Sequence, residues 1–109
     1  MRQKRKVSDL SKLHRRDFEW YVAKSLKAKG RKNITVGKGT SDNGRDIKAT
    51  WNGKLHLIQC KCYKTQSSIG VKTVRELFGV LMATEQHGVA VICATCNFTK
   101  SAKDFARKN

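Results

Sequence analysis

The stretch DIKATWNGKLHLIQCKC, residues 46–62, decides the fold because it predicts a β-hairpin. Asn52-Gly53 in its middle is the strongest short-range hairpin signal, since both residues tolerate the positive φ of a type I′ turn. Hydrophobic residues on either side of this dipeptide favour strands. We therefore expect strands at 45–51 and 54–62, joined by a two-residue loop.

Such a loop fixes which residues face each other across the hairpin. Counting back from the pair Trp51 and Lys54 places Asp46 opposite Gln59. Lys61 lies one diagonal step further on the same face, within a side-chain reach of about 5–8 Å. Side chains alternate along a strand, so the neighbouring residues point to the other face. These are Ile47, Ile58, Cys60 and Cys62.

The group formed by Asp46, Gln59 and Lys61 suits the hydrolysis of a phosphodiester bond with a hard divalent ion. Mg²⁺ prefers a few oxygen ligands and keeps several waters. The Asp46 carboxylate and the Gln59 amide oxygen could hold it, together with the backbone carbonyl of Cys60. Lys61 would then neutralise charge in the transition state. A cross-strand Asp–Lys pair on an exposed face explains the same pattern, and geometry alone leaves both interpretations open.

The rest of the chain predicts helices on both sides of the hairpin in sequence. The expected order is α-β-β-β-α-β-α, a mixed central β-sheet flanked by helices in the α/β class. The expected elements are a helix at about 9–29 stopped by Gly30, a strand at 33–36, a helix from Val71 ended by Gly88, a strand at 89–94 buried on both faces, and a last helix capped by Thr99 or Ser101 with Asp104 in its first turn.

The charge balance predicts a polyanionic partner. The chain has 24 Lys and Arg against 8 Asp and Glu, a formal net charge of +16. Basic side chains that bind phosphates release condensed counterions, so nucleic acid is favoured over a membrane. The composition fits one domain over residues 1–109, with a basic N-terminal arm at about 1–8.

The sequence also favours an intracellular protein. No apolar run approaches the roughly 18 residues that span a bilayer. The N-terminal residues MRQKRKVSDL are basic and lack the apolar segment of a signal peptide. We expect a cytoplasmic, nucleoid-associated protein whose cysteines are reduced thiols.

An ordered set of motifs from about Phe18 to Ala106 resembles the Mrr-like restriction endonucleases, of the PD-(D/E)XK nuclease superfamily. The motifs are FEWYVAKSLKAKG, TSDNGRDI, LIQCKCY, VRELFGVL and VAVICATCNFTKSAKDFA. The resemblance implies a mixed sheet with flanking helices and Mg²⁺-dependent cleavage of DNA, with Mn²⁺ as a substitute ion.

The resemblance also implies roles for four residues. Asp46 corresponds to the metal-binding aspartate, Gln59 takes the place of the second acidic residue, and Lys61 is the catalytic lysine. Glu19 matches a helix glutamate that completes the site in many members. Most of the superfamily has Asp or Glu where this chain has Gln59, although Gln-x-Lys is characteristic of the Mrr-like branch. From the residues alone, Glu19 could equally be a solvent-facing partner of Arg15 or Arg16.

The resemblance covers a catalytic module and leaves no room for a separate DNA-recognition domain. Specificity would then come from DNA structure, from a partner or from the basic surface. Junction or branched DNA is a reasonable substrate, and two-strand cutting favours a homodimer. The expected phosphate contacts are Arg2, Lys4, Arg5, Arg15, Arg16, Lys38 and Arg45.

Two other interpretations compete with the nuclease. The spacings CKC at 60–62 and CATC at 93–96 could indicate a zinc site with four cysteines, although both pairs fall on predicted strands. A small basic protein that binds nucleic acid without cutting it explains the charge equally well. It does not explain why Asp46, Gln59 and Lys61 share one face of a hairpin.

Overall fold

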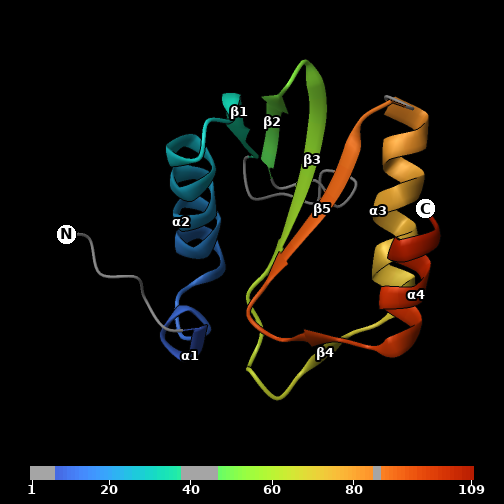
Figure 1. Cartoon of the computed structure of the whole chain (residues 1–109). Coiled ribbons are helices and arrows are strands. Elements are labelled where there is room, and N and C mark those ends of the chain that lie inside the picture. Colours follow the sequence, from blue (N-terminus) through green and yellow to red (C-terminus); the bar gives the residue numbers. More distant parts are fainter. Residues whose placement is uncertain (1–6, 38–46, 85–86) are drawn as a thin grey trace.

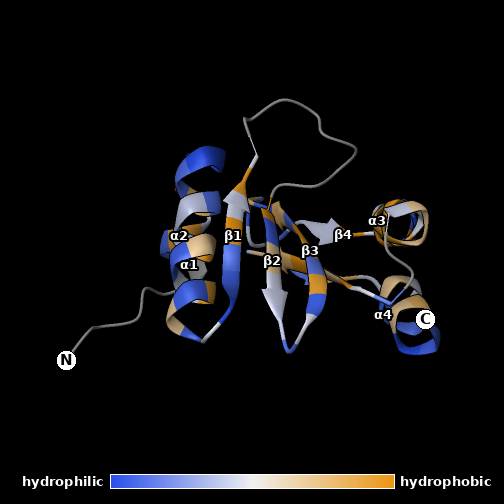
Figure 2. Ribbon diagram, turned by 90° about the horizontal axis from the view of Figure 1, so that it is seen from above, coloured by the Kyte–Doolittle hydropathy of each residue, from blue (hydrophilic) through white to orange (hydrophobic). Residues whose placement is uncertain are grey.

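The computed structural model describes residues 7–37, 47–84 and 87–109. It has three layers, with α1 and α2 on one side of a mixed sheet and α3 and α4 on the other (Figure 1; Figure 2, from above). The predicted fold class is confirmed. The elements are α1 (Val7–Leu10), α2 (Arg15–Ala28), β1 (Lys32–Val36), β2 (Ile47–Trp51), β3 (Lys54–Lys61), β4 (Ser68–Ile69), α3 (Val71–Thr84), β5 (Val89–Ala94), β6 (Asn97–Phe98) and α4 (Lys100–Lys108).

The hairpin turn forms at Asn52-Gly53 as predicted. Asn52 has φ 52° and Gly53 has φ 75°, the left-handed conformation that a type I′ turn requires. The antiparallel pairing of β2 with β3 runs from Trp51 with Lys54 to Ile47 with Ile58, in the predicted register.

The register directs alternate side chains of β3 into two apolar cores. Ile58 and Cys60 pack with α2 residues such as Phe18. Leu57 packs on the other face with Leu77 of α3. The alternation predicted for β3 is therefore confirmed.

β5 pairs in parallel with β3 and ends the four-stranded sheet, whose order is β1-β2-β3-β5. Both faces of β5 meet a core, since Val91 and Cys93 pack toward α2, and Ala90 and Ile92 toward α3. The expectation of a fully buried strand is nevertheless wrong, because Val89 is 36% exposed and the other residues are half-buried. An edge strand has a sheet neighbour on one side alone.

The single helix expected at 9–29 is in fact two helices, α1 and α2. His14 has an extended backbone and caps α2, and its Nδ1 accepts a hydrogen bond of 3.2 Å from the Arg16 amide. Cys62 explains why the chain breaks there. Its thiol donates to the carbonyls of Leu10 and Leu13, at 3.3 Å each. A continuous helix would use those carbonyls within its own ladder.

The predicted stop at Gly30 is confirmed by the way α2 ends. Gly30 has φ 99°, a conformation that favours glycine. The Gly30 amide donates to the Lys27 carbonyl and the Arg31 amide to the Leu26 carbonyl, both at 3.1 Å. This is a Schellman motif, which turns the chain directly into β1.

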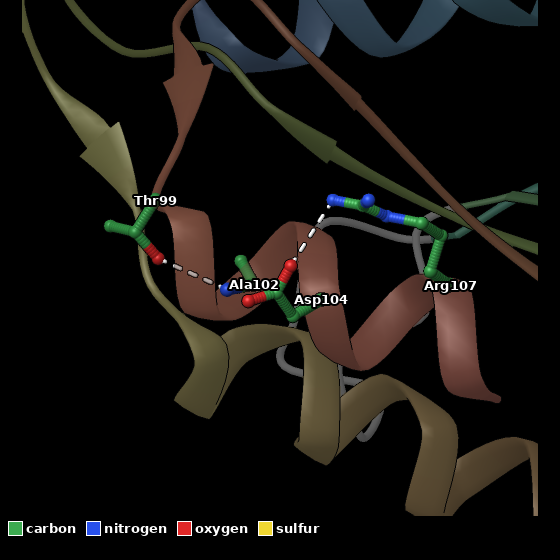
Figure 3. Close-up of polar contacts among 4 residues, drawn as sticks. All are labelled: Thr99, Ala102, Asp104 and Arg107. Atoms are coloured by element: carbon green, nitrogen blue, oxygen red, sulfur yellow. Dashed lines mark hydrogen bonds and ion pairs between the residues drawn. The ribbon is translucent and has the colours of Figure 1, made fainter.

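The C-terminal part contains a short parallel sheet of β4 and β6 that the sequence did not predict. Thr99 caps α4 as expected, because its hydroxyl accepts a 3.2 Å hydrogen bond from the Ala102 amide (Figure 3). Asp104 lies beyond the first turn, contrary to expectation, and pairs with Arg107 at 3.1 Å. No helix in the described ranges is long and apolar enough to cross a membrane.

Two glycine substitutions test the importance of the turn. Neither an added Cβ at Gly53 nor one at Gly79, within α3, would meet an atom within 4 Å. Gly53→Ala should lower the free energy of unfolding by about 1 kcal/mol, because alanine disfavours positive φ. Gly79→Ala should raise it by about 0.5–1 kcal/mol, because alanine is the better helix former. Urea denaturation measures both, and equal effects of the two changes would contradict the proposed turn requirement.

Candidate active site

Gln59 and Lys61 lie on one face of β3, near its carboxyl end. They alternate with Ile58 and Cys60, which are buried on the α2 side, so their side chains take the α3 side. Both are half-buried. β3 thus brings an amide and an ammonium together on the predicted face.

Asp46, the predicted partner of Gln59, lies outside the described residues. The last described pair of the hairpin is Ile47 with Ile58, one position before it. The pairing of Asp46 with Gln59 therefore stays a prediction, and it follows from continuing the observed register by one residue. The role of the Cys60 carbonyl as a metal ligand is likewise untested, although the Cys60 side chain is 3% exposed and belongs to the core.

Glu19 is a buried carboxylate within the apolar face of α2. Its exposed fraction is 2%, and the other buried residues of this helix are apolar. Glutamate is almost never fully buried unless it is paired. The alternative of a solvent-facing ion-pair partner for Arg15 or Arg16 is wrong, because the side chain does not face solvent.

Glu19 and Gln59 belong to opposite sides of β3. The Cys62 thiol, directly after β3, donates to the Leu13 carbonyl, which lies just before α2. The chain directions of α2 and β3 are opposite (Figure 1). α2 covers the face of β3 that carries Ile58 and Cys60, whereas the Gln59 side chain points to the other face.

The oxygen donors of these residues suit a hard divalent ion. The buried carboxylate of Glu19 and the half-buried amide of Gln59 carry oxygen donors, which Mg²⁺ prefers. Among the described residues, which do not include Asp46, no three of His, Cys, Asp and Glu form a metal-binding group. The roles of Glu19, Gln59 and Asp46 as metal ligands therefore stay a prediction.

The four cysteines do not form the alternative zinc site. All four lie within the described ranges, none of them forms a disulfide, and no group of three metal-ligating side chains includes them. Burial raises the pKa of the Cys62 and Cys93 thiols, so both stay protonated. Cys62 acts instead as the hydrogen-bond donor that ties β3 to the segment before α2.

The expected phosphate contacts are only partly described. Arg15 is exposed in the first turn of α2. Arg16 is half-buried, and its Nη1 donates to the Gly37 carbonyl at 3.4 Å, which ties α2 to the end of β1. The remaining candidates lie outside the described residues. They are Arg2, Lys4, Arg5, Lys38 and Arg45.

Thr95 and Tyr63 adjoin Lys61, and the sequence analysis did not single them out. The Thr95 amide donates to the Lys61 carbonyl at 3.1 Å. The Tyr63 ring is 41% exposed, and its centroid lies 5.8 Å from the Lys61 Nζ. Tyr63 follows Lys61 by two residues, two positions beyond the end of β3.

A second cluster, also missed, lies at the hairpin tip. The Arg31 guanidinium stacks over the Trp51 ring at 4.9 Å, and the edge of that ring meets His56 at 6.0 Å. His56 is 5% exposed, and its Nδ1 has no hydrogen-bond partner. Burial, with Arg31 and Lys54 nearby, lowers the pKa of His56. This cluster is separated from Lys61 by most of the length of β3.

Comparison with known proteins identifies the family. Residues 10–109 match a family model, Mrr_cat, described as restriction endonuclease. The chain belongs to the Mrr-like restriction endonuclease family. It therefore carries a domain of the nuclease type. No curated protein matches the sequence.

A solved structure supports the fold of this Mrr-like domain. The crystal structure of the protein of unknown function AF1548 matches with a TM-score of 0.67 at 21% sequence identity. The match covers 83% of this chain and 52% of that chain. The Mrr-like domain thus spans about half the length of AF1548 and shares its fold.

The lowered pKa of His56 predicts a loss of stability at acid pH. As the pH falls below the ordinary value of 6.5, the unfolded chain takes up a proton on His56 before the folded chain does. The free energy of unfolding should therefore decrease from about pH 6.5 down to the folded-state pKa. Urea denaturation between pH 8 and pH 5 should show a weaker decrease for His56→Leu. An equally steep decrease in His56→Leu would contradict the assignment of this pH dependence to His56. pH 8 serves as the reference because position 56 is neutral there in both the wild type and the variant.

Proposed function

We propose that this Mrr-like domain is a Mg²⁺-dependent endonuclease that hydrolyses phosphodiester bonds in DNA. The observation that supports the proposal best is the hairpin register. It places Gln59 and Lys61 on one face, and its continuation by one residue would bring Asp46 opposite Gln59. Family membership supplies the reaction class.

Each residue of the proposed site has one task. The oxygens of Asp46, Gln59 and Glu19 would hold the ion, with the Cys60 carbonyl as a further ligand. When bound, Mg²⁺ lowers the pKa of a coordinated water and offsets phosphate charge. The Lys61 ammonium lies two residues from Gln59 and would stabilise the charge that develops on the phosphate oxygens.

Gln59 makes the proposed ligand set less negative than two carboxylates on the hairpin would. A neutral amide oxygen coordinates the ion without adding charge, so Glu19 carries more of the electrostatic attraction. Burial of Glu19 at 2% exposure strengthens that attraction, because a low local dielectric weakens screening. We infer that Mg²⁺ affinity depends strongly on Glu19.

We further propose that DNA structure, rather than base sequence, selects the substrate. The charge of +16 favours contact with phosphates, which carry no base information directly. Junction or branched DNA presents more phosphates to such a surface than a single duplex does.

Two-strand cutting would need two copies, so we propose a homodimer on DNA. Cleavage of junction, flap and linear duplex of equal length tests the selectivity, and light scattering with and without DNA tests the dimer.

The competing function is a basic module that binds nucleic acid without cutting it. It accounts for the charge and for exposed basic residues such as Arg15. It does not account for the placement of Gln59 beside Lys61 on one face of β3. Binding without cleavage of any of the three DNA substrates, in either Mg²⁺ or Mn²⁺, would favour it over the nuclease.

Lys61→Met should lower the single-turnover cleavage rate by about 100-fold, because one charge-stabilising group in the transition state is lost. Lys54→Met is the matched control, since it removes the same charge from the other end of β3. Both variants should weaken DNA binding to a similar, small extent. Equal cleavage rates in the two variants would argue against a catalytic lysine at position 61.

Metal titration tests the ligand set. EDTA should abolish cleavage, and added Mg²⁺ should restore it. Gln59→Glu should lower the Mg²⁺ concentration that gives half-maximal cleavage, because it adds a negative charge to the site, and Glu19→Gln should raise it. Asp46→Asn should remove detectable cleavage at every Mg²⁺ concentration. Unchanged half-maximal concentrations in both Gln59→Glu and Glu19→Gln would exclude these residues as ligands.

A further inference from the structure

We propose that Thr95 and Tyr63 position the Lys61 ammonium for catalysis. The inference rests on the proposed role of Lys61 and assigns two further residues to that site. Thr95 would hold the backbone at the end of β3, and the Tyr63 ring would hold the lysine side chain.

Thr95 extends the pairing of β3 with β5 beyond the last strand residues. Lys61 and Ala94 are the final pair of the two parallel strands. The Thr95 amide then donates to the Lys61 carbonyl at 3.1 Å. Its hydroxyl accepts from the Tyr63 amide at 2.9 Å and donates to the Tyr63 carbonyl at 2.6 Å. One threonine therefore binds the backbone on both sides of Cys62.

The hydroxyl of Thr95 is fully used in these contacts and has no access to solvent. Thr95 is 1% exposed, so water has no access to the position of its hydroxyl when a substitution removes that group. A hydroxyl both donates and accepts, which lets it satisfy the amide and the carbonyl of Tyr63 together. A side chain of the same shape without the oxygen would leave both groups of Tyr63 unpaired.

The Tyr63 ring connects the backbone held by Thr95 to the Lys61 ammonium. The Lys61 Nζ lies 5.8 Å from the ring centroid, within the range of a cation–π interaction. A lysine side chain has four rotatable bonds and loses much rotamer freedom when a contact fixes its ammonium group. A ring fixed by the backbone of Tyr63 therefore limits where Nζ can lie relative to Gln59.

Four variants test the positioning. Thr95→Val removes the hydroxyl and keeps the shape, and it should lower the single-turnover rate at saturating DNA and Mg²⁺ by about tenfold or more, as a misplacement of around 1 Å can cost 100-fold. Thr95→Ser keeps the hydroxyl and should rescue the rate. Tyr63→Leu should lower the rate by about threefold through loss of the ring, whereas Tyr63→Phe should not. The dissociation constant for DNA should be unchanged in all four.

Thr84→Val is the matched control. The Thr84 hydroxyl donates to the Val80 carbonyl at 2.7 Å within α3 and takes no part in the hydrogen bonds of Thr95 with Tyr63, so its loss should leave cleavage unchanged. Melting temperatures identify any variant that fails to fold. If Thr95→Val unfolds, Thr95→Ser and the two Tyr63 variants still decide the question, because a purely structural threonine predicts equal rates for Tyr63→Leu and Tyr63→Phe.

A double-mutant cycle separates this inference from the proposed function. In the Lys61→Met background, Thr95→Val should cause no further loss of rate, because the group that it positions is absent. An unchanged rate in Lys61→Met itself would overturn the proposed function. A large loss in Lys61→Met, together with a wild-type rate in a folded Thr95→Val, would overturn the positioning role alone. Additive losses in the double variant would do the same.

Discussion

The left-handed backbone at Asn52-Gly53 is the constraint on which the rest of the structure depends. A two-residue loop allows one register, and that register sends alternate residues of β3 into two different cores. Ile58 then packs against α2 and Leu57 against α3. A slip of one residue would exchange the two faces, so the position of Gln59 and Lys61 and the packing of both helical layers follow from the same turn.

β3 is the element that joins the proposed chemistry to the fold. It pairs with β2 on one side and with β5 on the other, which makes it a central strand with little freedom to move. Its carboxyl end is held further by the Cys62 thiol, which contacts the segment before α2, and by Thr95, which contacts Lys61 and Tyr63. Polar groups on such a strand are placed more accurately than groups on loops would be.

The charge of the protein and the proposed site have different physical roles. A net charge of +16 brings any polyanion to the surface and is shared by proteins that catalyse nothing. Gln59 and Lys61, half-buried side by side on one face of a central strand, are the feature that distinguishes this domain from a simple basic surface. Membership of the Mrr-like family agrees with that distinction.

The sequence by itself determined the features that depend on neighbouring residues. These are the turn, the register, the two faces of β3, the stop at Gly30 and the cap at Thr99, because each follows from local backbone preference or from a period of two. The motif order also determined the family. Contacts between residues far apart in the chain were decided by the tertiary structure alone. Cys62 breaks the first helix from about 50 residues away, β5 is partly exposed because it is an edge strand, and the Thr95 hydroxyl meets Tyr63 only because β3 and β5 lie side by side. Glu19 is buried for the same reason, since a helix pattern does not show which of its polar residues will face the sheet.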